Sequence, residues 1–77
     1  MTNPANDFVV SVNVIPRDDG GEDYEFRGLD EDRVYADALN AKNAFARAMV
    51  PAISGQFRDI TSGEWVVRLS LKAGPLQ

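Results

Sequence analysis

Four acidic side chains, Asp18, Asp19, Glu22 and Asp23, form the densest cluster of groups in this chain that could do chemistry. Paired carboxylates can act as general acid and base, but only in a pocket that moves their pKa values apart. Their oxygens could also bind a hard cation, yet the segment RDDGGED lacks the alternating acids and the distant glutamate of an EF-hand loop. The glycines in this segment indicate a solvated turn, which favours neither catalysis nor metal binding.

Two missing residue types narrow the chemistry further. The 77 residues include no histidine and no cysteine. Without histidine, the chain lacks the commonest general base and metal ligand, and its serines have no partner of the Ser-His-Asp kind. Without cysteine, disulfides and thiolate metal sites are excluded. We therefore expect a protein that is not an enzyme and has no cofactor and no bound metal.

The charge is unevenly distributed along the chain. Residues 1–37 carry ten acids against three arginines, a balance of −7, whereas residues 38–77 have a balance of +3. An acidic half repels nucleic-acid phosphates and attracts a basic protein surface. We therefore predict no direct nucleic-acid binding, and a partner-binding surface at one end of the domain, made of Asp18, Asp19, Glu22, Asp23, Asp30, Glu31 and Asp32. The alternative for these acids is a solvated surface that keeps the protein in solution.

A helix predicted over residues 30–50 would position the acids at its start, Asp30, Glu31 and Asp32. Asp30 is a suitable N-cap, and Glu31 and Asp32 favour the positive end of the helix dipole. Apolar side chains at steps of three and four predict one buried stripe, made of Val34, Ala38, Ala41, Phe45, Met49 and Ala52.

The end of this helix is expected near residue 50, because Pro51 cannot donate a helical hydrogen bond. A short turn through Ser54, closed by Gly55, should follow. Lys42 projects near the apolar stripe, where it is either a stem reaching toward solvent or an ammonium at a binding surface.

Alternating patterns predict strands at residues 8–15, 23–27 and 64–72, whereas 56–60 is either a short edge strand or an irregular connection. Glycines at Gly20, Gly21 and Gly63 predict tight turns. The side chains expected to face the helix are Phe8, Val10, Val12, Val14, Tyr24, Phe26, Trp65, Val67, Leu69 and Leu71. The opposite sheet face should be wet, with Arg27, Val66, Arg68, Ser70 and Lys72 on it.

On that outer face, Arg27, Arg68 and Lys72 could form a basic strip, with Trp65 as a platform for stacking bases. Trp65 is, however, in phase with the core positions, so core packing is its expected role.

The elements together predict an α+β fold of two layers, in which a small antiparallel sheet packs on one helix in the order β-β-α-(β)-β. Residues 1–77 should form a single domain with loose tails at about 1–6 and 73–77. No apolar run approaches the roughly 20 residues that span a bilayer, and the N-terminus has no basic residue, so we expect a cytoplasmic protein without membrane contact. A chain this short has marginal stability, which a homodimer would improve.

The segments DDGGEDYEF and ALNAKNAFARAM, in a small acidic chain of this element order, resemble phage-encoded proteins of the anti-CRISPR type. That resemblance implies a non-catalytic inhibitor that docks on a basic surface of a CRISPR effector complex and blocks nucleic-acid binding or nuclease recruitment.

The same two segments, over roughly residues 15–49, are also similar to the core of HicB-type antitoxins. This second resemblance implies neutralisation of a basic toxin. The chain lacks that family's proline-rich stretch between strand and helix and its separate DNA-binding tail. A further alternative is a phage structural or assembly protein that self-associates through a sheet edge or through the flank formed by Tyr35 and Leu39.

Overall fold

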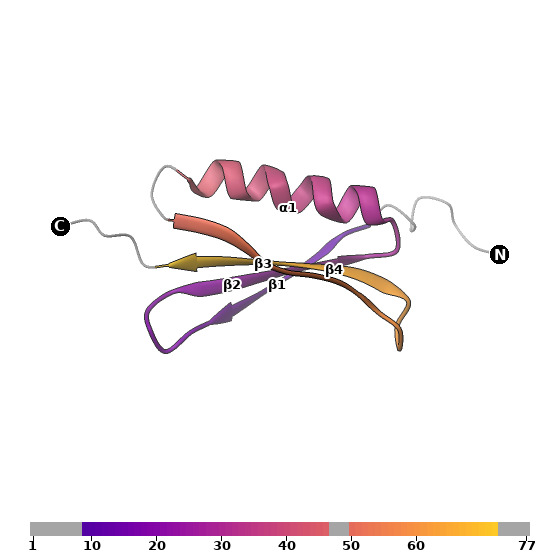
Figure 1. Cartoon of the computed structure of the whole chain (residues 1–77), viewed down its shortest axis with the longest axis horizontal. Helices are drawn as coiled ribbons and strands as arrows, with labels where there is room; N and C mark the ends of the chain where they lie inside the picture. The colour runs from indigo at the N-terminus through magenta and orange to yellow at the C-terminus, as the bar shows by residue number, and fades with distance from the viewer. Residues whose placement is uncertain (1–8, 47–49, 73–77) are drawn as a thin grey trace.

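The computed structural model describes residues 9–46 and 50–72, which form a four-stranded antiparallel sheet with a helix against one face (Figure 1). The predicted α+β class and element order are confirmed. The predicted tails, and Phe8 and Met49, lie outside the described residues. In chain order the elements are β1 (Ser11–Pro16), β2 (Glu22–Gly28), α1 (Glu31–Phe45), β3 (Val50–Asp59) and β4 (Glu64–Lys72).

The sheet has the strand order β1-β2-β4-β3, so the last strand is inserted between β2 and β3. β1 and β2 are joined by a turn at Gly20, with φ 89°, and β3 and β4 by a turn at Gly63, with φ 78°. Both angles are in the left-handed region that glycine tolerates, as the sequence predicts. β1 extends to Pro16. Proline has no backbone N–H to donate, and an edge strand tolerates this because only one of its sides pairs with a neighbouring strand.

The predicted end of the helix near residue 50 and the turn predicted after it are wrong, whereas the edge-strand alternative for residues 56–60 is confirmed. α1 ends at Phe45, and residues 50–59 are the strand β3 rather than a helix end followed by a turn at Ser54 and Gly55. Pro51 opposes helical geometry, whereas an extended segment can pair with β4 along its whole length. A bulge between Ile53 and Gly55 takes up the change of register. Residues 56–59 therefore belong to a long edge strand.

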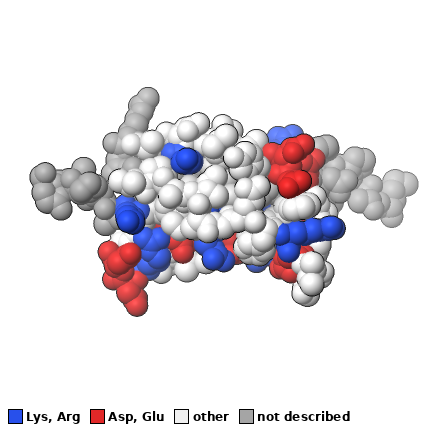
Figure 2. Space-filling view, viewed as in Figure 1, with Lys and Arg blue, Asp and Glu red and all other residues white. Residues whose placement is uncertain are grey.

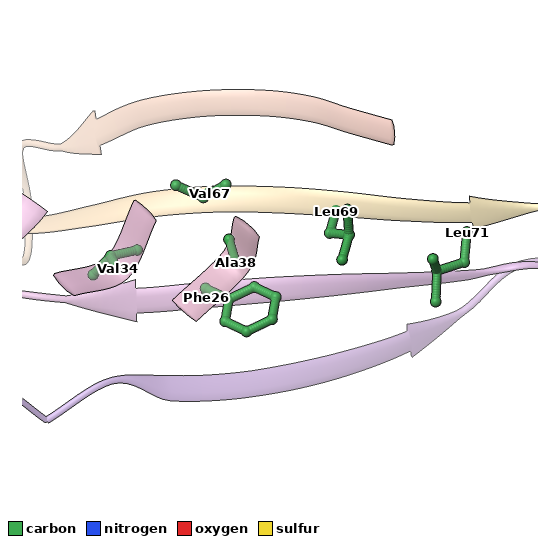
Figure 3. Packing of buried hydrophobic residues seen from close by; sticks show 6 residues of the cluster. All are labelled: Phe26, Val34, Ala38, Val67, Leu69 and Leu71. Carbon is green, nitrogen blue, oxygen red and sulfur yellow. The ribbon is translucent and has the colours of Figure 1, made fainter. Parts of the chain in front are cut away.

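The core lies between α1 and the two central strands (Figure 3). Val34 and Ala38 are fully buried, which confirms the first part of the helical stripe. Phe45 packs against this cluster, with its ring centroid 5.0 Å from that of Tyr24. Trp65 also packs against it, as expected, and Arg58 lies over its ring at 5.5 Å. The buried cluster is made of Phe26, Val34, Ala38, Val67, Leu69 and Leu71.

Three side chains are on the predicted faces of the sheet but differ from the predicted exposure. Val12 and Val14 pair with Phe26 and Tyr24 in the register of the sheet, so they are on the helix side, yet both are exposed. The helix packs mainly on β4, β2 and β3, which leaves β1 uncovered. Val66, expected on the wet face, is fully buried there, between the cross-strand neighbours Arg27 and Phe57.

Gly28 sets how closely the chain approaches itself where β2 leads into the helix. A Cβ atom at this position would lie 2.9 Å from Cγ2 of Val34 and 2.8 Å from the carbonyl oxygen of Val9. Both distances are shorter than van der Waals contact, so only glycine fits without a shift of the helix or of the neighbouring chain.

We predict that Gly28→Ala lowers the free energy of unfolding by about 1–3 kcal/mol, because the added methyl group pushes Val34 out of the core. Gly55→Ala is the matched control, since a Cβ there meets its nearest neighbour at 3.7 Å. Urea unfolding of both variants and the wild type gives the comparison. Equal midpoints for the two variants would contradict the close approach at Gly28.

Candidate functional site

The predicted acidic residues form two groups at opposite ends of the domain. The first is at the turn between β1 and β2, and the second is at the start of α1, after β2 has run the length of the sheet. Seven strand residues at about 3.3 Å each separate them by roughly 20 Å. Figure 2 shows acidic side chains toward both ends of the face in view. The expectation of one combined patch is therefore wrong, and the strand between the two groups was the sequence signal against it.

At the turn between β1 and β2, two of the acids are used within the fold. Arg17 donates to Asp19 at 3.2 Å and to Asp23 at 2.6 Å, and it also reaches the carbonyl oxygen of Leu71 at 3.3 Å. The amide of Gly21 donates to Asp19 at 2.9 Å and, with Arg17, lowers the pKa of that carboxyl. These contacts offset the negative charge and fix the turn.

The other two acids of this group, Asp18 and Glu22, are not paired with an arginine among the described residues. Glu22 accepts a hydrogen bond from the Tyr24 hydroxyl at 3.2 Å and is half-buried. Asp18 is exposed at the tip of the turn. Of the four acids predicted here, Asp18 is therefore the exposed one whose side chain makes no hydrogen bond or ion pair among the described residues.

At the start of α1, Asp30 acts as the N-cap. Its Oδ1 accepts a hydrogen bond from the backbone N–H of Arg33 at 3.0 Å, as the sequence predicts. Glu31 and Asp32 follow in the first helical turn and are exposed. Their charge both stabilises the helix start and faces solvent.

A shallow hollow of about 400 Å³ extends from the helix start along α1. We call it the acidic groove, because three aspartates and one arginine line it. Among the described residues, no ion pair includes Asp30, Asp32 or Asp37. Asp37 was absent from the predicted site, although its helical spacing from Asp30 and Arg33 places the three on one side. The lining residues are Asp30, Asp32, Arg33, Ala36, Asp37 and Asn40.

A second depression, of about 260 Å³, adjoins the turn between β2 and α1. It combines the exposed apolar side chains of Val9 and Leu29 with the polar groups of Arg27 and Glu64. Leu29 immediately precedes Asp30, so an exposed apolar side chain lies next to the start of the acidic groove.

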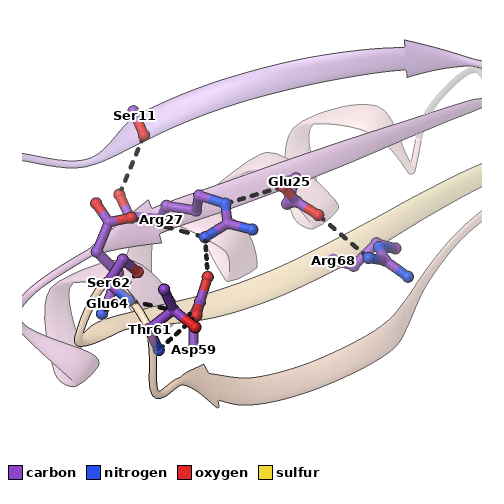
Figure 4. A network of polar contacts seen from close by, with 8 residues as sticks. All are labelled: Ser11, Glu25, Arg27, Asp59, Thr61, Ser62, Glu64 and Arg68. Atoms are coloured by element: carbon purple, nitrogen blue, oxygen red, sulfur yellow. Dashed lines mark hydrogen bonds and ion pairs between the residues drawn. The ribbon is translucent and has the colours of Figure 1, made fainter.

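The outer sheet face carries a network of ion pairs instead of the predicted basic strip (Figure 4). Arg27 donates to Glu25 at 2.9 Å and to Asp59 at 3.1 Å, and Arg68 donates to Glu25 at 3.1 Å. Glu64 lies 3.6 Å from Arg27. The acids offset both arginines, so this face gives no support for phosphate binding.

Glu25 is the centre of that network and is only 9% exposed. The Arg27 guanidinium lowers the pKa of the Glu25 carboxyl below its ordinary value of 4.5, burial opposes the shift, and Arg68 adds to it. Arg27 similarly lowers the pKa of Asp59, together with the backbone N–H groups of Thr61 and Ser62. The network is therefore built from carboxylates that the fold keeps ionised.

We predict that Glu25→Gln lowers the free energy of unfolding at neutral pH by about 1–3 kcal/mol, because it removes the buried carboxylate that pairs with both Arg27 and Arg68. The ordinary pKa of Glu25 exceeds its folded-state value. Its stabilising effect is therefore present above pH 4.5 and is lost as the pH falls through the folded-state pKa. The variant should lose less stability on acidification than the wild type.

Urea unfolding from about pH 6 to about pH 3 measures this difference. Asp18→Asn, at the exposed tip, is the control and should change stability by less than about 0.5 kcal/mol. An unchanged pH dependence in Glu25→Gln would show that the network does not act through Glu25.

A second prediction separates the capping role of Asp30 from a role in binding. Asp30→Ala should lower the free energy of unfolding by about 1 kcal/mol, whereas Asp30→Ser should retain most of it, because serine also accepts from the first-turn amides. Thermal unfolding followed by circular dichroism compares them. The capping role is wrong if the serine variant is as unstable as the alanine variant.

Three findings bear on what kind of protein this is. Within residues 9–46 and 50–72, no group of three or more acidic side chains is placed to hold a metal ion. In the same part of the chain, no helix has the length and apolar character needed to cross a membrane. Comparison with protein-family models, with curated proteins and with solved structures gave no match.

Proposed function

We propose that the chain is a non-catalytic inhibitor that binds a basic surface of a larger protein or nucleoprotein complex through its acidic groove. The observation that carries this proposal is the set of aspartates along α1. Asp32 and Asp37 are in no ion pair among the described residues, in contrast to Asp19 and Asp23 at the turn between β1 and β2.

The chemistry of the groove suits a lysine or arginine side chain from a partner. Three carboxylates against one guanidinium give it a net negative charge, which attracts a basic surface over a distance of about 10 Å at ordinary salt. The exposed Leu29 beside Asp30 offers apolar contact at the same place. Apolar contact of this kind supplies affinity, whereas the charge supplies steering and specificity.

The resemblance to anti-CRISPR proteins makes a CRISPR effector complex the first partner to test, because such complexes hold nucleic acid in positively charged channels. An acidic groove bound in such a channel would block nucleic-acid binding or nuclease recruitment. Neutralisation of a basic toxin, which the similarity to HicB-type antitoxins suggests, would use the same surface. The identity of the captured protein distinguishes the two.

We predict that the double variant Asp32→Asn/Asp37→Asn weakens partner capture about tenfold at low salt and less at high salt, because screening already removes most of the attraction there. Its matched control is Asp18→Asn/Glu22→Gln, which removes two charges at the opposite end of β2 and should bind as the wild type does. Asparagine and glutamine preserve side-chain size, and thermal unfolding of each variant checks the fold.

The measurement is affinity capture with the three proteins as baits, from purified CRISPR effector complexes and from a lysate of the source cells, with quantitative mass spectrometry. Proteins that the wild type and the control retain, and that the groove variant loses, identify the partner. Equal capture by all three baits, or a loss confined to the control, would overturn the acidic groove as the binding site.

A further inference from the structure

Strand β1 is an uncovered edge of the sheet with apolar side chains on both faces. Pairing with β2 leaves its second edge without a neighbouring strand in the described part of the chain. On the helix side, Val12 is 50% exposed and Val14 is 45% exposed. On the outer side, Val9 and Ile15 are 60% and 40% exposed. Four large apolar side chains are thus exposed within seven residues, a concentration that marks an interaction surface.

The two edges of the sheet differ in how they discourage pairing with another strand. The edge strand β3 contains Pro51, a bulge between Ile53 and Gly55, and the charged side chains of Arg58 and Asp59. All three are devices that protect an edge from association. Residues 9–15 carry no charge, the one proline of β1, Pro16, is its last residue, and the six β1 pairs are in uninterrupted register. β1 is therefore the edge that remains open to a partner strand.

The order of residue types along this segment reads the same in both directions. Residues 9–15 are VVSVNVI, in which apolar and polar types are symmetric about Val12. An antiparallel copy of the same segment centred on Val12 would pair Val10 with Val14, Ser11 with Asn13, and Val9 with Ile15. Directly opposite residues point to the same face of a sheet, so every pair would be apolar with apolar or polar with polar.

We propose that β1 is a homodimer interface, in which β1 pairs antiparallel with β1 of a second copy about a two-fold axis at Val12. The symmetry of the segment selects a second copy as occupant, because it would give no advantage with an unrelated strand. The absence of charge supports the same choice, since two chains of net charge −4 can approach most easily where neither carries charge. The result is an eight-stranded sheet with both helices on one face.

The pairing requires that both copies keep their helices on the same side of the joined sheet. When the two-fold axis passes through a residue, as it does at Val12, each helix-side residue of one copy lies opposite a helix-side residue of the other. A shift by one residue would place Val12 opposite an outer-face side chain and expose the apolar row of one copy. This interface does not include the aspartates of the acidic groove, so it does not depend on the proposed function.

A lysine at the two-fold axis tests the interface. Val12→Lys places two like charges opposite each other and should raise the dimer dissociation constant at least about tenfold. Val50→Lys is the matched control, because Val50 is 52% exposed on the other edge strand. Sedimentation equilibrium over a concentration series should give a monomer–dimer equilibrium for the wild type and the control, and a monomer for Val12→Lys.

Cross-linking provides a second test that does not depend on the lysine variant folding. The chain has no cysteine, so each single-cysteine variant reports one position. Opposite residues in an antiparallel pair have Cβ atoms about 4.5–5.5 Å apart, close enough for a disulfide after a small adjustment. Oxidised Val12→Cys should form a covalent dimer, whereas Val50→Cys should not.

Three results would overturn the proposal. The first is a wild-type protein that stays monomeric up to millimolar concentration. The second is equal cross-linking of Val12→Cys and Val50→Cys. The third is a wild-type protein that forms open-ended assemblies instead of stopping at a dimer, because that requires a second interface at the β3 edge.

Discussion

One helix is too narrow to cover a four-stranded sheet, and most features of this domain follow from that limit. A helix with its side chains is about 10 Å across, whereas four strands spaced about 4.8 Å apart extend over roughly 14 Å between the outer strand axes. α1 packs on β4 and β2 and, to a lesser extent, on β3, and the fully buried side chains Leu69 and Leu71 are on the central strand β4. The cost of this arrangement is the exposed apolar row on β1.

The opposite face of the sheet has no second layer in the described part of the chain, and ion pairs take the place of an apolar core there. Cross-strand register puts Glu25 opposite Arg68, and Arg27 opposite the buried Val66. Long arginine side chains cover apolar surface with their stems while their guanidinium groups bind carboxylates. The polar face is therefore a structural layer, in which the arginines pair with carboxylates of the same sheet.

The acidic residues of this chain consequently divide into two kinds. Those around Arg17, Arg27 and Arg68 hold the hairpins and the sheet together, whereas those along α1 face solvent in a groove. A dimer formed through β1 would present two acidic grooves on one rigid body. A partner whose two basic surfaces are as far apart as the two grooves would bind the dimer more tightly than one groove alone. Once the first groove is bound, the second is held at a high effective concentration near its own site.

The sequence by itself determined the features that depend on short-range rules. The N-cap at Asp30, the helical stripe as far as Phe45, the glycine turns and the strand at 64–72 follow from periodicity and from the conformational freedom of glycine. Only the tertiary structure decided the length of β3, because residues 50–59 have no clear period of their own and become a strand by pairing with β4.

The same division applies to the candidate site. The sequence showed which residues are acidic, but an ion pair depends on where the chain brings its partner. Arg17 reaches both Asp23 and the carbonyl oxygen of Leu71, which is 54 residues away, and this contact exists only in the folded sheet. Folding therefore decided which carboxylates are neutralised and which, along α1, are in no ion pair among the described residues.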